Sequence, residues 1–260
     1  MIYRKSGKIA RIILNQPKEK NILNANMKAD IIQCIGLLEN DDDVVVGIIK
    51  GNGNVFCAGS EPPRYDARYG ISKRADGSTR RPSQRARLWL GKDDLKFISR
   101  VRRCSKPLIC QAHGACFDEG VELSAVCDIT IAAEDCQFGH PNVEQRQRFG
   151  GMIGMNGLNE VLLIGPKKTR ELLLLGNIIN GKEAENIGLV NHAVPLKQLE
   201  SVVEKMASEI ASIPRDALYI GKTGTILTLN NLEPSPMQSV VMRALASNIR
   251  IEPSEQGGNK

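Results

Sequence analysis

The segment 118–126, DEGVELSAV, places acidic residues at the start of a short predicted helix. Glu122 has apolar neighbours in sequence, and a carboxyl group buried among apolar side chains acquires a pKa suited to proton transfer. The backbone N–H groups at a helix start also favour negative charge beside them. The same pattern fits the acidic face of an amphipathic helix in which Asp118 and Glu119 cap the first turn.

A second polar segment, GHPNVE at 139–144, contains three side chains that could take part in chemistry. His140 would titrate near neutrality, and Asn142 can orient a water molecule but cannot take its proton. Glu144 would face the same side as Asn142 if the segment is extended. A structural role for the histidine and a solvated position for Glu144 remain open.

The composition predicts a globular, cytoplasmic protein. The chain has 260 residues, 42% hydrophobic and 25% charged, and no apolar run of the about 18 residues that cross a membrane. Seven cysteines are scattered without a CxxC pair or clustered histidines, so we expect reduced thiols and no zinc site. The net charge of +6 could attract nucleic acid or a phosphorylated cofactor, while 4% aromatic residues argue against stacking on single strands.

Alternation and helical spacing predict an α/β fold with a largely parallel sheet. Strands are expected at 8–14, 44–50, 107–114 and 128–133, and helices at 27–38, 119–126, 167–175 and 196–212. From about residue 157 onward the pattern is mostly helical, with no strand to match the first half. We therefore predict a core at 1–195 and a C-terminal helical region at 196–260, with a disordered tail from about 252.

Four segments, in order, resemble the enoyl-CoA hydratase/isomerase (crotonase) superfamily over some three quarters of the chain. They are IILNQPKEKNILNANM at 12–27, VFCAGSE at 55–61, KPLICQAHGACFDEGVELSAVCDITIAAEDCQFGHPNV at 106–143 and LLLLGNIINGKEAENIGLVNHAVP at 172–195. The resemblance implies stacked ββα units with a C-terminal helical region, usually assembled as homotrimers or dimers of trimers. It also implies an acyl-CoA thioester substrate and no tightly bound cofactor or metal.

The resemblance assigns roles to individual residues. The backbone N–H groups of Ser60 and Glu119 would form an oxyanion hole for the thioester oxygen, and Glu122 matches the first of two catalytic glutamates. Asn142 stands where the second glutamate is expected, and Glu144 is a possible replacement. The coenzyme A contacts would come from Lys18, Lys20, Asn21, Leu23, Ala58 and Ser60.

Two departures from the family pattern affect the expected chemistry. A Gly-Gly-Gly run is replaced by Asp118-Glu119-Gly120, which gives up backbone freedom and adds two carboxylates. The insert at 61–103 is long and basic, and we hypothesise that it covers a bulky or polar acyl group, with Trp89 and His140 beside that group.

The sequence thus predicts an enoyl-CoA hydratase or isomerase that acts through a stabilised thioester enolate. The lost second glutamate favours an alternative crotonase-type reaction, such as hydrolysis, decarboxylation or ring chemistry. A third hypothesis is a catalytically silent protein of this fold that binds RNA or a partner, for which the basic charge is the support. We expect no membrane partner and consider nucleic acid the weaker partner hypothesis.

Overall fold

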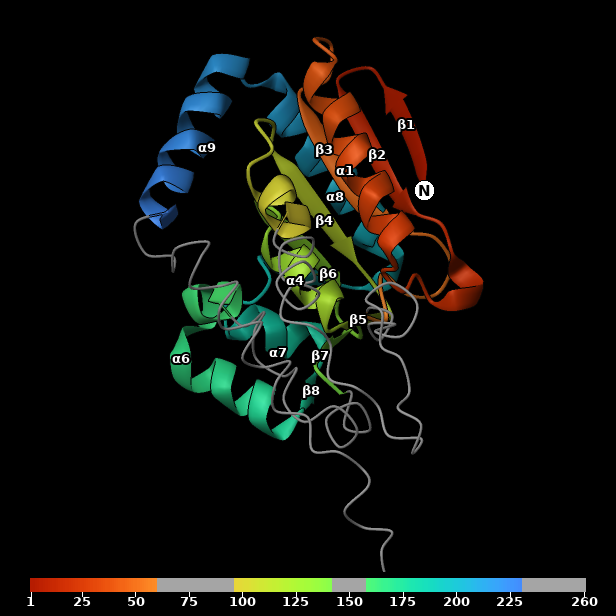
Figure 1. Ribbon diagram of the computed structural model, residues 1–260, viewed down its shortest axis with the longest axis vertical. Coiled ribbons are helices and arrows are strands. Elements are labelled where there is room, and N and C mark those ends of the chain that lie inside the picture. The colour runs from red at the N-terminus through yellow and green to blue at the C-terminus, as the bar shows by residue number, and fades with distance from the viewer. Residues whose placement is uncertain (60–95, 142–157, 231–260) are drawn as a thin grey trace, which may run out of the picture.

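The computed structural model describes residues 1–59, 96–141 and 158–230. Within these ranges the chain forms a large sheet, a small sheet at one end of it, and helices packed on both (Figure 1). The predicted α/β fold is confirmed.

The large sheet has six strands in the order β1-β2-β3-β4-β6-β9. Its strands are β1 Ile2–Ser6, β2 Ile9–Leu14, β3 Val46–Gly51, β4 Leu108–Ala112, β6 Ile129–Ala133 and β9 His192–Val194. Only β1 pairs antiparallel with its neighbour, and the other pairings are parallel. Every residue of β4 is buried, as expected for a strand whose two faces are both covered.

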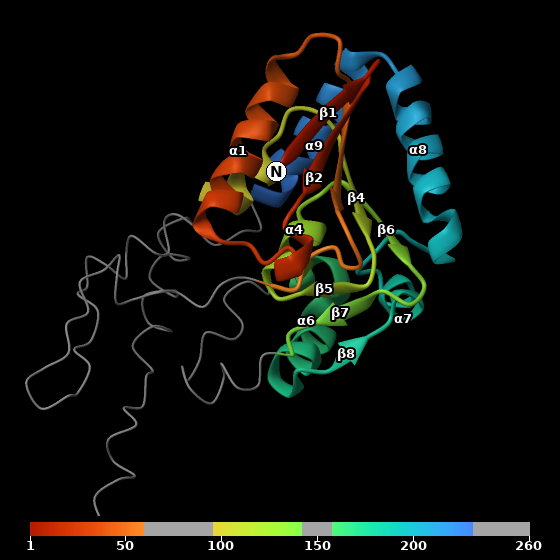
Figure 2. The same cartoon turned by 90° about the vertical axis from the view of Figure 1, so that its right-hand side faces the viewer.

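Helices cover both faces of the large sheet (Figure 2). Helix α1, Ala25–Asn40, and helix α9, Arg215–Asn230, lie on one face, and helix α8, Leu196–Ser212, lies on the other. The buried residues of α8 recur every four positions, at Leu199, Val203, Ala207 and Ala211. This periodicity is why the boundaries predicted for α8 from sequence were correct.

A buried polar contact attaches α9 to the sheet. The Lys222 ammonium donates to Asp128 Oδ2 at 2.6 Å and to the Lys106 carbonyl at 3.0 Å. Asp128 Oδ2 also accepts the Leu108 N–H at 2.7 Å. The lysine and the aspartate therefore join α9 to the ends of two central strands.

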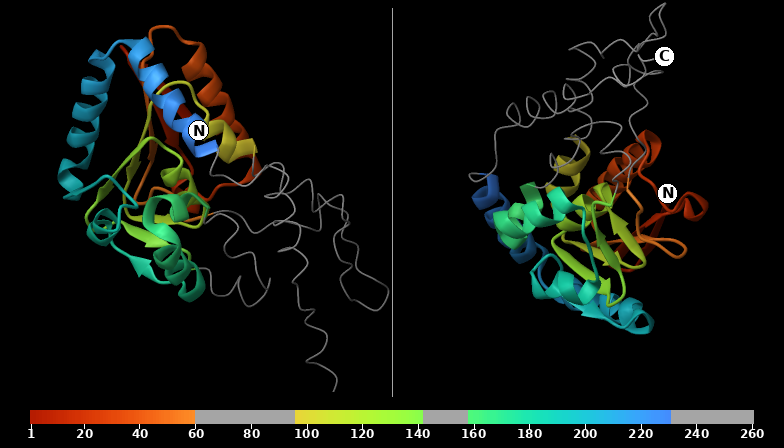
Figure 3. Two further views of the ribbon diagram at one scale, coloured as in Figure 1. Left: turned by 90° about the vertical axis from the view of Figure 1, so that its left-hand side faces the viewer. Right: turned by 90° about the horizontal axis from the view of Figure 1, so that it is seen from below.

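The small sheet lies at one end of the large one, with helices beside it (Figure 3). It contains β5 Ala115–Phe117, β7 Gln137–Gly139 and β8 Ile178–Ile179, and its neighbours are α4 Glu119–Ala125, α6 Leu158–Leu175 and α7 Gly181–Asn186. The expectation that no strand follows residue 157 is wrong, because β8 and β9 lie there. Strands of two and three residues are too short to give an alternating pattern.

The remaining expectations from composition concern cysteines and membranes. All seven cysteines are free thiols, and six of them are buried. Burial raises the pKa of Cys57 to about 12, which keeps its thiol protonated and unreactive. No helix in the described ranges is both long and apolar enough to cross a membrane.

Candidate functional site

The first turn of α4 packs directly on the turn formed by residues 57–59. The Phe117 N–H donates to the Cys57 carbonyl at 2.9 Å, which brings the two segments together. A Cβ atom on Gly120 would lie 2.9 Å from that same Cys57 carbonyl oxygen. Position 120 therefore favours glycine, because the carbonyl oxygen and the buried side chain of Cys57 leave no room for a Cβ there.

The backbone at the start of α4 is suited to meeting an anion. Asp118, the N-cap residue, has φ 47° and ψ −113°, and its side chain does not cap the helix. A non-glycine residue at such angles is strained, and strain of this kind collects at functional sites. The first N–H groups of any α-helix point out of the helix end, where they and the helix dipole favour an anion.

The turn 57–59 is held on its other side by residues 20–23. The Leu23 N–H donates to the Gly59 carbonyl at 2.8 Å, and the Ala58 N–H donates to the Lys20 carbonyl at 3.0 Å. The two segments that were expected to contact coenzyme A are therefore side by side. Lys18 lies in the short 3₁₀ helix Pro17–Glu19, and the side chains of both Lys18 and Lys20 are exposed.

Asn21 has a structural task in this arrangement. Its side chain is completely buried, accepts the Gln16 N–H at 2.9 Å, and donates to the carbonyls of Asn52 and Val55 at 3.0 and 2.9 Å. These bonds occupy the amide and join the turn after β2 to the turn after β3. Asn21 thus positions the loops, and Leu23 beside it is 1% exposed and belongs to the core.

Glu122 lies at the end of the first turn of α4 and is 4% exposed. The residues on either side of it, Val121 and Leu123, are buried as well, so the surface-helix alternative from sequence does not apply. A carboxyl group this deep experiences a desolvation cost when charged, which is the setting in which carboxyl groups become proton carriers.

Asp118, His140 and Glu160 form a row of charged groups that runs inward from α4. Asp118 Oδ1 lies 3.4 Å from His140 Nδ1, and His140 Nε2 lies 3.4 Å from Glu160 Oε1. The side chains are 22%, 10% and 3% exposed, respectively. Among the described residues His140 is the charged partner of the Glu160 carboxylate.

The pKa of His140 reflects a balance of two effects. Burial lowers the pKa, and the contacts with Asp118 and Glu160 raise it more, to about 9. His140 is therefore an imidazolium at neutral pH, with a carboxylate on each side. A buried carboxylate such as Glu160 depends on that positive charge.

Glu119, the other new carboxylate, has a cation of its own. Lys28 of α1 places its ammonium 2.8 Å from Glu119 Oε2, and the two side chains are only 17% and 12% exposed. The pair lies across the interface between α1 and α4, far apart in sequence. Partial burial makes it stronger than an exposed surface pair.

Sequence reasoning missed Lys28 and Glu160, and the structure does not describe four of the residues that it did predict. Ser60, Trp89, Asn142 and Glu144 fall outside the described residues. Lys28 is one of several lysines near the N-terminus, and Glu160 is one acidic residue in an apolar helix; only the fold brings them to α4. In the described ranges, no group of three or more His, Cys, Asp or Glu residues could hold a metal.

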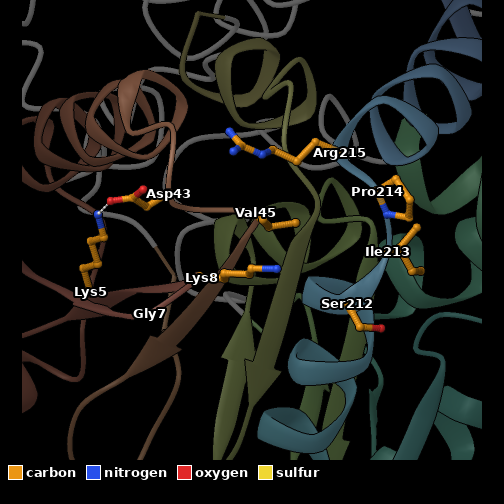
Figure 4. A pocket seen from close by; sticks show the side chains of 9 residues that line it. All are labelled: Lys5, Gly7, Lys8, Asp43, Val45, Ser212, Ile213, Pro214 and Arg215. Atoms are coloured by element: carbon orange, nitrogen blue, oxygen red, sulfur yellow. Dashed lines mark hydrogen bonds and ion pairs between the residues drawn. The ribbon is translucent and has the colours of Figure 1, made fainter.

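A surface hollow is found at the other end of the large sheet (Figure 4). Lys8 and Val45, which line it, precede β2 and β3, so it lies at the amino ends of the parallel strands. Two of its charged lining residues, Lys5 and Asp43, form an ion pair at 2.9 Å. The turn 57–59 and α4 instead follow the carboxyl ends of β3 and β4, where open α/β sheets bind ligands.

Comparisons with known proteins agree on one family. A family model described as enoyl-CoA hydratase/isomerase matches residues 4–231. A probable mitochondrial enoyl-CoA hydratase from Dictyostelium discoideum is 32% identical over 84% of this chain and 72% of its own length. A short-chain-enoyl-CoA hydratase from Clostridium acetobutylicum is 30% identical over 85% of this chain and 79% of its own.

Solved structures agree with the sequence comparisons. A probable enoyl-CoA hydratase from Mycobacterium thermoresistibile superposes with a TM-score of 0.80 at 26% identity, covering 95% of this chain and 96% of its own. An enoyl-CoA hydratase/isomerase from Xanthobacter autotrophicus has a TM-score of 0.80 at 27% identity, covering 95% and 86%. The fold described above is the fold of these proteins.

Proposed function

Since the chain belongs to the enoyl-CoA hydratase/isomerase family, we propose that it is an enoyl-CoA hydratase or isomerase acting through a stabilised thioester enolate. The observation that carries the proposal is the packing of the α4 start on the turn 57–59, with buried Glu122 one turn further along. This arrangement supports a site in which backbone N–H groups meet an oxygen anion and a carboxyl group close by moves a proton.

The proposed chemistry uses α4 for both of its parts. The thioester oxygen accepts hydrogen bonds from the N–H groups of Ser60 and Glu119, and the negative charge of the enolate collects there. In isomerisation, Glu122 takes a proton from the carbon next to the carbonyl and returns it two carbons further on. In hydration, water loses a proton as its oxygen adds to the β-carbon, and the α-carbon gains a proton. Glu122 carries out one of these two proton transfers.

The proposed orientation of the substrate follows from which segments adjoin α4. The coenzyme A half would lie along residues 18–23 and 58–60, where Lys18 and Lys20 are exposed and can meet phosphates. The acyl half would point toward His140 and the insert at 61–103 that contains Trp89. Asn142 and Glu144 would then decide how water is held.

A panel of enoyl-CoA thioesters of different chain length and branching tests this function. Addition of one water to any member, detected by mass and lost in Glu122→Gln, would identify a hydratase; a mass-neutral shift of the double bond, lost in the same variant, would identify an isomerase. Release of free coenzyme A or of carbon dioxide instead would replace the proposal with another reaction of the family.

A matched control separates chemistry from folding. Glu39 is also a partly buried carboxylate, 18% exposed, and it accepts the Ser105 N–H at 2.7 Å in a part of the core away from α4. Glu39→Gln should lower stability and leave turnover per folded molecule unchanged. If both variants lose turnover equally, Glu122 has no special role.

We also propose a homotrimer or dimer of trimers in the cytoplasm. Helices α6 and α9 expose large apolar side chains, among them Leu174 at 75% and Ile220 at 70%. Exposure of this kind is common at subunit interfaces. Light scattering gives the mass in solution, and Leu174→Glu or Ile220→Glu should yield smaller assemblies; a monomeric wild type would contradict the proposal.

A further inference from the structure

The start of α4 contains two carboxylates at the place where negative charge would develop during the reaction. Asp118 and Glu119 replace the first two glycines of the family's pattern. A Cβ on Gly59 would lie 3.2 Å from Asp118 Oδ2, so the Asp118 carboxylate is directly beside the turn that leads to Ser60. Uncompensated carboxylates at this place would repel an oxygen anion and so oppose the benefit that the N–H donors supply.

Each of the two carboxylates, however, meets a cation from a distant part of the chain. His140, which follows β7, lies 3.4 Å from Asp118, and Lys28 of α1 lies 2.8 Å from Glu119. Both cations are largely buried, with side chains 10% and 17% exposed. The two carboxylates at the positions of two neutral glycines are thus each paired with a cation.

Glu160 of α6 completes the arrangement on the inner side. Its carboxylate lies 3.4 Å from His140 Nε2 and is 3% exposed. In the described part of the chain, the charged groups facing His140 are thus Asp118 from α4 and Glu160 from α6, with the Lys28–Glu119 pair next along α4. With a carboxylate on both ring nitrogens, His140 keeps its proton at neutral pH, as its raised pKa of about 9 indicates.

We propose that Lys28 and His140 are positioning residues that neutralise Glu119 and Asp118, and thereby keep the start of α4 able to stabilise the enolate oxygen. The inference rests on the proposed function and deepens it. Neither cation needs to touch the substrate. Glu160 acts one step further away, by keeping the positive charge on His140.

Double variants give the decisive test, because a compensating charge becomes unnecessary once its partner is neutral. His140→Gln alone and Lys28→Met alone should each lower kcat by about 10- to 100-fold on the enoyl-CoA that the wild type turns over. Adding Asp118→Gly to the first, or Glu119→Gln to the second, should restore kcat to within about threefold of the wild type. Such recovery is a coupling between the two positions, whereas two independent losses would simply add.

A purely structural role for the two cations predicts the reverse. The double variants would then lose at least as much kcat as the single ones, and that result would overturn the proposal. Thermal melting of each variant confirms that the compared proteins are folded. Arg11→Met is the matched control, since it removes a partly buried ion pair with Glu204, 22% and 31% exposed, between β2 and α8; its kcat should not change.

A measurement without substrate separates this inference from the proposed function. The chain has only three histidines, so the ring-proton signal of His140 can be assigned by its disappearance in His140→Gln. It should titrate near 9 in the wild type and at lower pH in Asp118→Asn and Glu160→Gln. Titration near the ordinary value of about 6.5 would overturn the pairing. Titration of His140 near 9 in a protein that turns over no enoyl-CoA would refute the proposed function instead.

Discussion

The turn 57–59 and the first turn of α4 both face the proposed position of the thioester oxygen, but they are built in different ways. The turn is held by neutral backbone hydrogen bonds to residues 20–23 and contains no charged side chain. The first turn of α4 contains Asp118, Glu119 and Glu122, and its charges are held in place by pairing with Lys28 and His140. One half depends on steric fit and the other on charge balance.

The difference indicates how the start of α4 could still stabilise an oxygen anion although two of its glycines are replaced by acidic residues. Gly59 has φ 112° and Gly120 packs against Cys57, so the steric requirements of the site remain met. Position 118 has lost its glycine and holds an aspartate at φ 47°, which is a conformation that costs about 1–3 kcal/mol. The contact with His140 offsets part of that cost, because it places the Asp118 carboxylate beside a cation.

The largest expected effect sharpens the comparison on the α4 side. Glu122→Gln keeps the shape of the buried side chain and removes its ability to carry a proton, so kcat should fall by about 10²–10⁴-fold with little change in KM. The measurement is steady-state kinetics on the substrate found in the panel. A rise in KM at constant kcat would assign Glu122 to binding and leave the proton transfer to another group.

A second prediction concerns the pH dependence of stability. The pKa of His140 is raised to about 9 in the folded protein, above the ordinary value of 6.5. Because the folded form holds its proton more tightly, the stabilisation is fully present below pH 6.5 and is lost as the pH rises through 9. The shift corresponds to about 3 kcal/mol.

Urea unfolding at pH 6 and at pH 9.5 measures this loss. The buried thiols add their own alkaline destabilisation, because burial raises the pKa of residues such as Cys57 and Cys104. That contribution is common to the wild type and to His140→Gln, so the difference between them isolates His140. If the free energy of unfolding of His140→Gln falls with pH as much as that of the wild type, the proposed charge balance at α4 is wrong.

The third prediction tests the steric half. Gly120→Ala places a Cβ 2.9 Å from the Cys57 carbonyl, an atom of the backbone that cannot turn aside. We expect a loss of about 1–3 kcal/mol in the free energy of unfolding, together with lower kcat, because α4 must move off the turn. Gly36→Ala in α1 is the control: no atom lies within 4 Å of its Cβ, and helix propensity should make it up to about 1 kcal/mol more stable.

The sequence predicted those parts of the molecule whose cause is local. Helix α8 was found by its four-residue periodicity, and the buried setting of Glu122 was indicated by its apolar neighbours. The proximity of residues 18–23 to the turn 57–59 came from the family resemblance. The first two depend on a pattern that a single stretch of chain contains, and the third depends on two motifs of the family.

The rest depends on contacts between distant segments. Lys28 and Glu119 are 91 positions apart, and no pattern in either segment points to the other. Glu160 had no signal at all, because one acidic residue in an apolar helix fits a solvated position equally well. Asn21 was expected to bind coenzyme A, yet its amide is used by three backbone groups that only the folded loops bring together.

The smallest expected effect lies beyond the turn, at the exposed lysines that would meet phosphates. Lys18→Met and Lys20→Met should each raise KM by a few-fold and leave kcat unchanged, because an exposed charge pair contributes no more than about 1 kcal/mol. The effect should shrink as salt is added, since screening weakens attraction between exposed charges.

The control for these lysines is Lys197→Met, an equally exposed lysine at the start of α8 on the opposite face of the sheet. It removes the same charge from the whole protein, so a general loss of attraction for an anionic substrate would raise KM equally in all three variants. A rise confined to Lys18 and Lys20 would place the phosphates beside the neutral half of the site. Charge at the turn 57–59 would then come from the substrate, whereas at α4 it comes from the protein.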